Sequence, residues 1–339
     1  MRRYLSPILY LIFCLVMIAA TKGNWINAYL QLVAMFIGVN IILSASLNLV
    51  NGYMGEFSVG HAGFMAVGAY ITSVLNVWFF TSSSVFGPAL MEPSRALYLF
   101  PLTLLIGGIG AALVGLLVAV PSFRTRGDYL AIITLAVNYI VKSSIENMQV
   151  IGGARGFMGM SGVVSGMKEA VNLPWVMIWV LIAVGLTVWV IQRFVSSTYG
   201  KGIVAVRDDE IAAEIMSVDT RRMKMIAFML SSGMAGVAGG LFAHILGYIN
   251  PGTFTIMKST EVLVMVYLGG MGSLSGSVIS AIGLTVILEL LRPLQVIKWV
   301  VVPLLLILLM FFRPEGIMGH RELPDVFPRL RRLFSAPER

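Results

Sequence analysis

Glu56 and His61 are the ionisable side chains of Asn48–Tyr70, a stretch that interrupts an otherwise apolar part of the chain. Ionisable groups at membrane depth are candidates for a transport pathway. The alternative is that both side chains stabilise a tight turn at the membrane edge. The other histidines, His244 and His320, have no ligand-like spacing to His61, so no metal site is expected. The stretch also holds five glycines, which are Gly52, Gly55, Gly60, Gly63 and Gly68.

Such glycines are typical of a helix that is broken at membrane depth, where an irregular backbone is tolerated only if it is buried in protein or lines a wet cavity. A comparable cluster, GGMGSLSG, spans Gly269–Gly276. The sequence therefore predicts two local breaks, both on the cytoplasmic side.

Thr134, Asn138 and Lys142 recur at every fourth position, so they share one face of a helix. A polar stripe of this kind is more often a face that forms hydrogen bonds between helices than a substrate contact. It is nevertheless the best candidate in this chain for lining a pathway. Carboxylates that could instead serve an ion-coupled transporter are Glu146, Glu261 and Glu289.

The longest strongly charged run inside the apolar chain is Tyr199–Lys224. Within it, Asp209–Val218 is predicted to be a short amphipathic helix, capped by Asp208 or Asp209. About 15 Å of helix is too short to cross a bilayer core of about 30 Å, so we expect it in a cytoplasmic loop, where it contacts a separate motor protein. One face carries Ile211, Ile215 and Val218, and another carries Glu210, Glu214 and Ser217.

Several functions are disfavoured by what the sequence lacks. There is no G-x-x-x-x-G-K-[ST] motif, no Ser/His/Asp set and no His-Glu-x-x-His motif, so the chain is not expected to be an enzyme or to bind ATP itself. With Cys14 as the single cysteine, an internal disulfide is impossible. The net charge of +8 is better explained by basic loops that contact anionic lipid than by nucleic-acid binding.

The elements that must position these residues are membrane helices. Of the 339 residues, 58% are hydrophobic and 12% charged, whereas a soluble domain carries about 25% charge. We therefore predict an all-α, polytopic transmembrane bundle with glycine-broken segments and about ten spans. The predicted spans are Leu5–Thr21, Ile26–Val50, Ala62–Val77, Leu97–Val120, Tyr129–Met148, Pro174–Phe194, Met225–Leu246, Thr260–Leu268, Val278–Leu291 and Val296–Phe312.

Ten spans place both termini on the same side of the membrane. The proposed inside loops hold twice as many Lys and Arg residues as the outside loops, which predicts cytoplasmic termini. Residues 1–312 form the predicted permease domain, with a cytoplasmic coupling loop at 196–224, and residues 313–339 form a basic cytoplasmic tail. Asn147–Leu173 is expected to be an external loop, either flexible or a docking surface.

Four stretches resemble the LivM-type permease of bacterial branched-chain amino acid ABC importers: Gly52–Tyr70, Arg126–Ala136, Gly152–Met160 and Tyr199–Ala243. The resemblance covers nearly all of Ile26–Phe312. The E-x-A-A-x-x-x-[small] coupling motif of such permeases falls on Glu210, Ala212, Ala213 and Ser217, and Ser217 stands where many importers have Gly. The residues expected to contact the ATPase are therefore Asp209, Glu210, Ala212, Ala213, Glu214 and Ser217.

The resemblance implies a subunit of an ATP-driven importer in the bacterial inner membrane that translocates leucine, isoleucine or valine. It implies a LivH-type second permease, two cytoplasmic ATPase subunits that bind ATP and Mg²⁺, and a periplasmic or lipid-tethered binding protein. Two alternatives stay open. A sister group with similar glycine motifs imports urea and amides, and an ion-coupled secondary transporter would need no ATPase.

Overall fold

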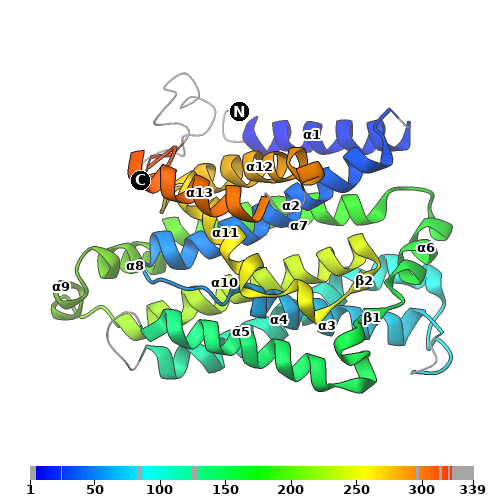
Figure 1. Ribbon diagram of the computed structural model, residues 1–339, viewed down its shortest axis with the longest axis horizontal. Helices are drawn as coiled ribbons and strands as arrows, with labels where there is room; N and C mark the ends of the chain where they lie inside the picture. Colours follow the sequence, from blue (N-terminus) through cyan, green and yellow to red (C-terminus); the bar gives the residue numbers. More distant parts are fainter. Residues whose placement is uncertain are drawn as a thin grey trace.

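The protein is a bundle of α-helices, as predicted (Figure 1). The computed structural model describes residues 5–23, 25–82, 86–123, 129–294, 298–312, 315–319 and 321–322. Each of the ten predicted spans overlaps a helix of this part of the chain. These helices are α1 (Leu5–Lys22), α2 (Ala28–Asn48), α3 (His61–Phe80), α4 (Ala96–Ser122), α5 (Tyr129–Asn147), α7 (Trp175–Ser196), α10 (Thr220–Leu246), α11 (Ile256–Gly269), α12 (Leu274–Leu290) and α13 (Lys298–Phe312).

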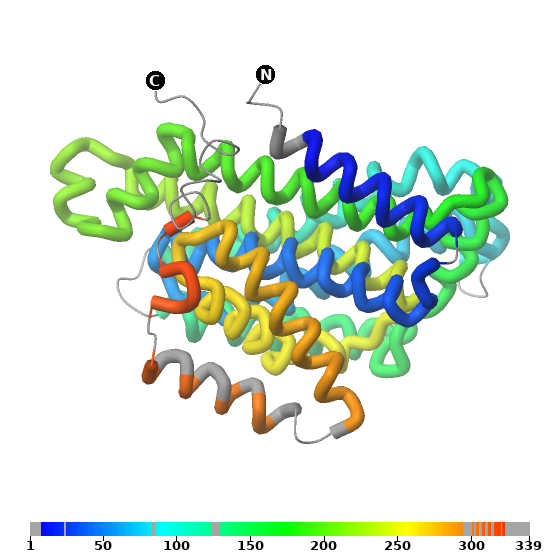
Figure 2. The backbone as a smooth tube through the Cα atoms, turned by 90° about the horizontal axis from the view of Figure 1, so that it is seen from above, coloured from blue at the N-terminus to red at the C-terminus, as the bar shows by residue number. Residues whose placement is uncertain are grey.

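Six helices in the described part of the chain are long and apolar enough to cross a membrane. They follow from runs of apolar residues, because a helix satisfies all of its backbone polar groups internally. The other four of these ten helices are shorter, and α12 and α13 run in different directions when the bundle is seen from above (Figure 2). The six long segments are Ala28–Tyr53, His61–Phe80, Pro93–Ser122, Tyr129–Asn147, Trp175–Ser196 and Thr220–Leu246.

Small residues bring α3, α4 and α10 together at the centre of the bundle. A Cβ added to Gly68 on α3 would lie 2.2 Å from the Gly236 Cα on α10. On α4, a Cβ added to Gly115 would lie 2.0 Å from the Ser232 Oγ, and Ala111 packs on Gly236. Ser232, Gly236 and Gly240, small residues at four-residue spacing on α10, thus let the three backbones approach closely.

The two ends of the bundle carry different additions. Two short helices, α8 (Thr198–Asp208) and α9 (Glu210–Ile215), project from one end, called here the α9 end (Figure 1). The opposite end holds α6 (Met160–Ala170) and a two-stranded antiparallel sheet of β1 (Phe157–Met158) and β2 (Tyr248–Ile249). Within the predicted external loop, β1 thus pairs with β2 just after α10, and α6 packs against Pro93 and Thr81, which adjoin Gly166 and Gly162.

Both predicted glycine breaks exist, and they contact each other at the α9 end. After α2, the chain continues through a π-helical turn, η2 (Leu49–Tyr53), and then runs without helix to α3. Asn48 accepts a hydrogen bond from the Gly272 N–H (2.9 Å) and donates to the Ser273 carbonyl (2.8 Å). Gly52 allows this contact, because a Cβ there would lie 2.3 Å from the Gly272 nitrogen.

The first part of the predicted tail packs against the second break. The Ile317 and Met318 N–H groups donate to the Leu268 and Gly269 carbonyls (2.9 and 3.1 Å). The Glu322 carboxylate accepts hydrogen bonds from the Leu274 and Ser275 N–H groups at the start of α12. Residues 323–339, the remainder of the predicted tail, lie outside the described residues.

Candidate functional site

Three side-chain caps divide the charged run into separate helices. The Ser197 hydroxyl accepts a hydrogen bond from the Gly200 N–H at the start of α8. The Asp209 carboxylate accepts one from the Ala212 N–H (3.0 Å), and the Asp219 carboxylate accepts one from the Arg222 N–H (3.0 Å). Such caps satisfy N–H groups that have no partner within the helix. Asp209 thus caps α9, which was one of the two predicted possibilities.

The helix predicted over Asp209–Val218, which is α9, is shorter than predicted. It ends at Ile215 instead of Val218, because Ser217 adopts a left-handed conformation with φ of 62°. The Ser217 N–H donates to the Glu214 carbonyl and the Val218 N–H to the Ala213 carbonyl, which is the Schellman pattern of helix termination. Glycine adopts this conformation without strain. The position where the coupling motif of importers often has glycine is therefore the position that needs a positive φ.

The large apolar side chains of α9 and of its C-terminal cap are exposed. Ile211, Ile215 and Met216 are between 68 and 78% exposed, whereas Ala213 is 5% exposed and packs inward. Three exposed apolar side chains next to acidic ones form a surface suited to a partner protein. Met216 was not among the predicted contact residues. It belongs to this surface because it directly follows the last residue of α9 and is exposed. Ala212 and Glu214, both predicted contact residues, are also exposed.

Lys224 connects the two stretches that the sequence singles out. Its Nζ donates to the Glu56 carboxylate at 2.7 Å and to the Glu210 carboxylate at 2.9 Å. Lys224 lies one turn inside α10 and is 7% exposed. Glu56 belongs to the first glycine break and Glu210 to α9. The name ionic junction is used below for Glu56, Lys224 and Glu210.

Sequence reasoning missed the role of Lys224, which it counted only among the basic residues of the loop. The signal that could have revealed it is its position, because it directly precedes the predicted apolar span Met225–Leu246 and can enter the protein as part of the same helix. The two carboxylates offset the unfavourable burial of its charge. The predicted pathway residue Glu56 and the predicted coupling residue Glu210 are thus joined by one ammonium group.

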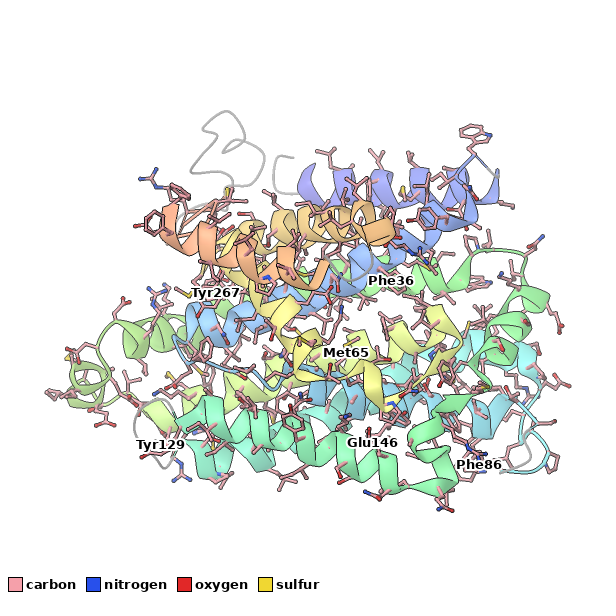
Figure 3. All side chains as sticks on the ribbon, viewed as in Figure 1. Phe36, Met65, Phe86, Tyr129, Glu146 and Tyr267 are labelled. Atoms are coloured by element: carbon pink, nitrogen blue, oxygen red, sulfur yellow. The ribbon has the colours of Figure 1, made fainter. Side chains whose placement is uncertain are left out.

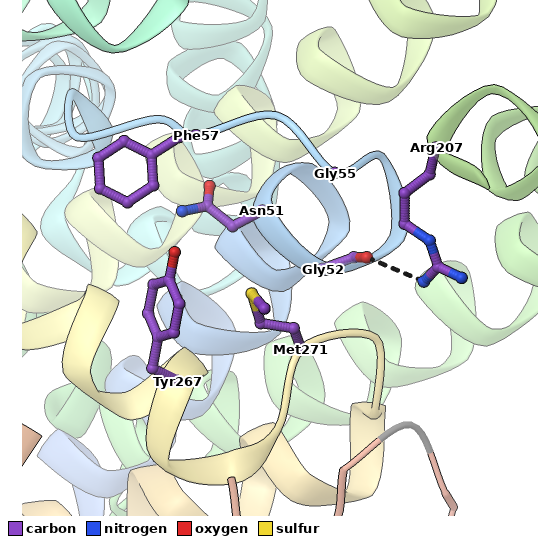
Figure 4. A pocket seen from close by; sticks show the side chains of 7 residues that line it. All are labelled: Asn51, Gly52, Gly55, Phe57, Arg207, Tyr267 and Met271. Carbon is purple, nitrogen blue, oxygen red and sulfur yellow. Dashed lines mark hydrogen bonds between the residues drawn. The ribbon is translucent and has the colours of Figure 1, made fainter. Parts of the chain in front are cut away.

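Arg207 makes a second connection between the same elements. From α8, its guanidinium donates to the Gly52 carbonyl (3.2 Å) and to the Asp208 carboxylate (2.9 Å). The Arg207 side chain also covers Gly55, where φ is +76° and an added Cβ would lie 2.5 Å from the Arg207 Cγ. These contacts border a pocket of about 320 Å³ (Figure 4). The pocket is lined by Asn51, Gly52, Gly55, Phe57, Arg207, Tyr267 and Met271.

His61 begins α3 at the end of the extended segment that follows Glu56. It is buried, and its Nε2 is 2.8 Å from the Ser46 hydroxyl on α2. The next residue, Ala62, donates its N–H to the Ser259 hydroxyl on α11 (3.0 Å). The extended segment is thus held at both ends, by the ionic junction at Glu56 and by the hydrogen bonds of α2 and α11 around His61.

The predicted polar stripe of α5 divides into a buried part and a more exposed part. Thr134 accepts a hydrogen bond from the Val59 N–H (3.2 Å), so it binds the extended segment. Asn138 is buried against Gly63, and its Oδ1 has no partner among the described residues. Lys142 forms an ion pair with Glu146 (3.4 Å), which lies toward the α6 end (Figure 3). Only Thr134 and Asn138 therefore adjoin the glycine break.

Comparison with known proteins gave consistent matches along the chain. A family model described as branched-chain amino acid transport system / permease component matches residues 29–312. The permease protein LivM of the high-affinity branched-chain amino acid transport system of Escherichia coli (strain K12) is 32% identical, over 86% of this chain and 69% of that protein. A probable LivM protein of Methanocaldococcus jannaschii is 22% identical, over 89% of this chain and 96% of its own length.

The matches extend to the other permease of such systems. The LivH protein of Escherichia coli (strain K12) is 22% identical, over 86% of this chain and 96% of that protein. No solved structure matched the chain. The family match covers all the helices that hold the ionic junction, and the apolar helices make this a multi-pass membrane protein. The chain therefore belongs to the family of permease components of branched-chain amino acid transport systems.

Proposed function

We propose that this chain is the LivM-type permease subunit of an ATP-driven importer that carries leucine, isoleucine and valine into the cell. The observation that carries this proposal is the family match over residues 29–312, and the ionic junction supports the coupling role, since it connects an exposed surface helix to a segment inside the bundle. Family membership and the names of the relatives support the substrate class. In this proposal the chain supplies the path and the coupling, and it has no catalytic role.

The proposed assembly contains a LivH-type permease as the second half of the pore. It also contains two cytoplasmic ATPase subunits, which hold ATP and Mg²⁺, and a periplasmic or lipid-tethered binding protein that delivers the amino acid. The α9 end faces the cytoplasm in this arrangement, because it carries the charged run and the exposed apolar side chains of α9. Both chain termini then lie in the cytoplasm as well.

The proposed coupling passes through Lys224. When the ATPase subunits close, they displace α9, and Glu210 moves with it. Lys224 transmits this displacement to Glu56, because the two carboxylates share its ammonium group at 2.7 and 2.9 Å. From Glu56 the chain runs through the extended segment to His61 on α3. Arg207 transmits the same motion to Gly52, because its guanidinium binds that carbonyl.

The coupling must supply enough free energy to switch the permease between its two states. Moving a two-state equilibrium from 1:99 to 99:1 takes about 5.5 kcal/mol of differential binding. A charged hydrogen bond contributes about 1.5–3 kcal/mol. The three bonds of the ionic junction and Arg207 together are comparable with this requirement, and the proposal requires that they persist while α9 moves.

The test is uptake of labelled leucine into proteoliposomes that contain the whole transporter, with ATP inside and loaded binding protein outside. Omission of this chain is expected to abolish uptake. Unlabelled isoleucine and valine are expected to compete, and an ionophore is expected to have no effect. Uptake that responds to urea and not to leucine would assign the chain to a urea and amide importer. Ionophore-sensitive uptake without ATPase subunits would make it a secondary transporter.

A further inference from the structure

A second charged group lies deep in the bundle, apart from the ionic junction. Lys258 and Glu261, one turn apart on α11, form an ion pair with an Nζ–Oε2 distance of 3.2 Å. The Lys258 Nζ also donates to the Asn40 Oδ1 on α2 (3.3 Å), and the Asn40 Nδ2 donates to the Thr285 hydroxyl on α12 (2.9 Å). These hydrogen bonds connect three helices through one polar chain.

The position of Asn40 places the Lys258–Glu261 pair near the middle of the membrane-spanning part of the bundle. Asn40 lies in the middle of the long apolar segment Ala28–Tyr53. At 14 residues, α11 is about 21 Å long, shorter than a bilayer core of about 30 Å, and its first residues lie near the centre of the bundle (Figure 1). The first turn of α11 also binds the start of α3 through Ser259 and Ala62. Two helices therefore begin inside the bundle at the same place.

Stability alone gives little reason for this ion pair. Replacing a buried pair with apolar residues is often neutral or stabilising, because desolvation offsets the attraction between the charges. The Lys258 and Glu261 side chains are 15% and 21% exposed, so they are mostly desolvated yet not sealed. Ionisable residues inside membrane segments are candidates for substrate contacts by default.

Hydrogen-bonding capacity remains at both charges. An ammonium group has three donors, and within the described residues two of those of Lys258 are used, by Asn40 and Glu261. In the same set of residues, the Glu261 Oε1 has no hydrogen-bond partner, and Thr255 caps α11 without a side-chain hydrogen bond. A free N–H of a cation and a free carboxylate oxygen therefore lie side by side, next to the positive end of a helix dipole.

We infer that Lys258 and Glu261 form a contact site for the transported zwitterionic amino acid. The carboxylate of the substrate binds the Lys258 ammonium and the start of α11, and the ammonium of the substrate binds Glu261. An α-amino acid carries one charge of each sign a few ångströms apart, which matches this pair. Half-helices that begin at the membrane midplane offer the same chemistry to anionic groups of substrates. This inference rests on the proposed function, because it requires that amino acids pass through the chain.

The experiment exchanges the two charges in the whole transporter, reconstituted in proteoliposomes. Lys258→Glu combined with Glu261→Lys keeps an ion pair at the same spacing and reverses its polarity. Leucine uptake is expected to fall at least tenfold, with ATP hydrolysis within twofold of the wild type. Lys258→Met and Glu261→Gln are expected to lower uptake by a similar factor. The matched control, Lys22→Met, removes an exposed lysine at the end of α1 and is expected to leave uptake unchanged.

The possible results separate the inference from the proposed function. Uptake restored to within twofold by the charge exchange would show that the pair is only structural and would overturn the inference. Glutamine has the same shape as glutamate but no charge. Unchanged uptake in Glu261→Gln would therefore also overturn the inference, even if other variants fail to assemble. Absence of leucine uptake by the wild-type transporter, with normal assembly, would instead overturn the proposed function.

A second measurement examines binding directly. Labelled leucine is titrated onto the nucleotide-free transporter in nanodiscs without the binding protein. Excess 4-methylpentanoate, which lacks the ammonium group, and 3-methylbutylamine, which lacks the carboxylate, are expected not to displace it, whereas isoleucine is. Saturable binding that survives the charge exchange would contradict the inferred site.

Discussion

Replacing Lys224 with methionine is the most informative perturbation of the ionic junction. Methionine keeps much of the length and the apolar stem of lysine but removes the ammonium group. Glu56 and Glu210 then lose the cation that they share at 2.7 and 2.9 Å. No cation then links Glu210 on α9 to Glu56 in the glycine break. We therefore expect ATP hydrolysis to continue while leucine uptake falls.

The magnitude follows from the burial of the two carboxylates. The Glu56 side chain is 22% exposed, so its charged hydrogen bond is worth about 1.5–3 kcal/mol. The Glu210 side chain is 48% exposed, so its ion pair is worth about 0–1 kcal/mol. Together the two contacts are worth about 1.5–4 kcal/mol, which corresponds to a change of about 10- to 900-fold in the coupling between α9 and the glycine break. At least a tenfold lower ratio of leucine transported to ATP hydrolysed is therefore expected.

The assay measures uptake and phosphate release in the same proteoliposomes. Lys224→Arg, which keeps the positive charge, is expected to restore part of the ratio. Lys201→Met is the matched control, because it removes an exposed lysine from α8 in the same charged run and should leave the ratio unchanged. If Lys224→Met transported as many leucine molecules per ATP as Lys201→Met, the coupling route proposed for the ionic junction would be refuted.

Three further substitutions probe the same region and its surroundings. Ser217→Gly removes the strain of a left-handed serine and should stabilise the end of α9 by about 1 kcal/mol, measured as slower proteolysis of the coupling loop, with transport unaffected. Ala213→Arg places a large cation at a buried position and should abolish binding of the ATPase subunits in pull-down while membrane insertion persists; normal ATP-driven uptake would remove α9 from the mechanism. Asn138→Leu should reduce uptake several-fold with ATPase binding intact, and unchanged uptake would leave Asn138 a purely structural role against Gly63.

The helices could be predicted from the sequence because their cause is local. A run of about twenty apolar residues has few structures available in lipid other than a helix, and each predicted span overlaps one. The cap at Asp209 was predictable for the same reason, since it depends on residues three positions apart. The end of α9 was predicted wrongly. Ser217 fits the polar face of an ideal helix, so its spacing gives no sign that its backbone is left-handed and ends the helix before Val218.

Contacts between distant residues were decided by the tertiary structure alone. The pairing of Lys224 with Glu56 spans 168 positions, and that of Lys258 with Asn40 spans 218. Asn48 brings the two glycine breaks together across 224 positions. The sequence singles out Glu56 and the two glycine clusters but not Lys224, Lys258 or Asn40. It carries no information on which groups meet, because that depends on how close-packed glycines and alanines orient the helices. Composition and periodicity determined a polytopic helical protein with a short helix in its charged run, and packing determined which charges that helix can reach.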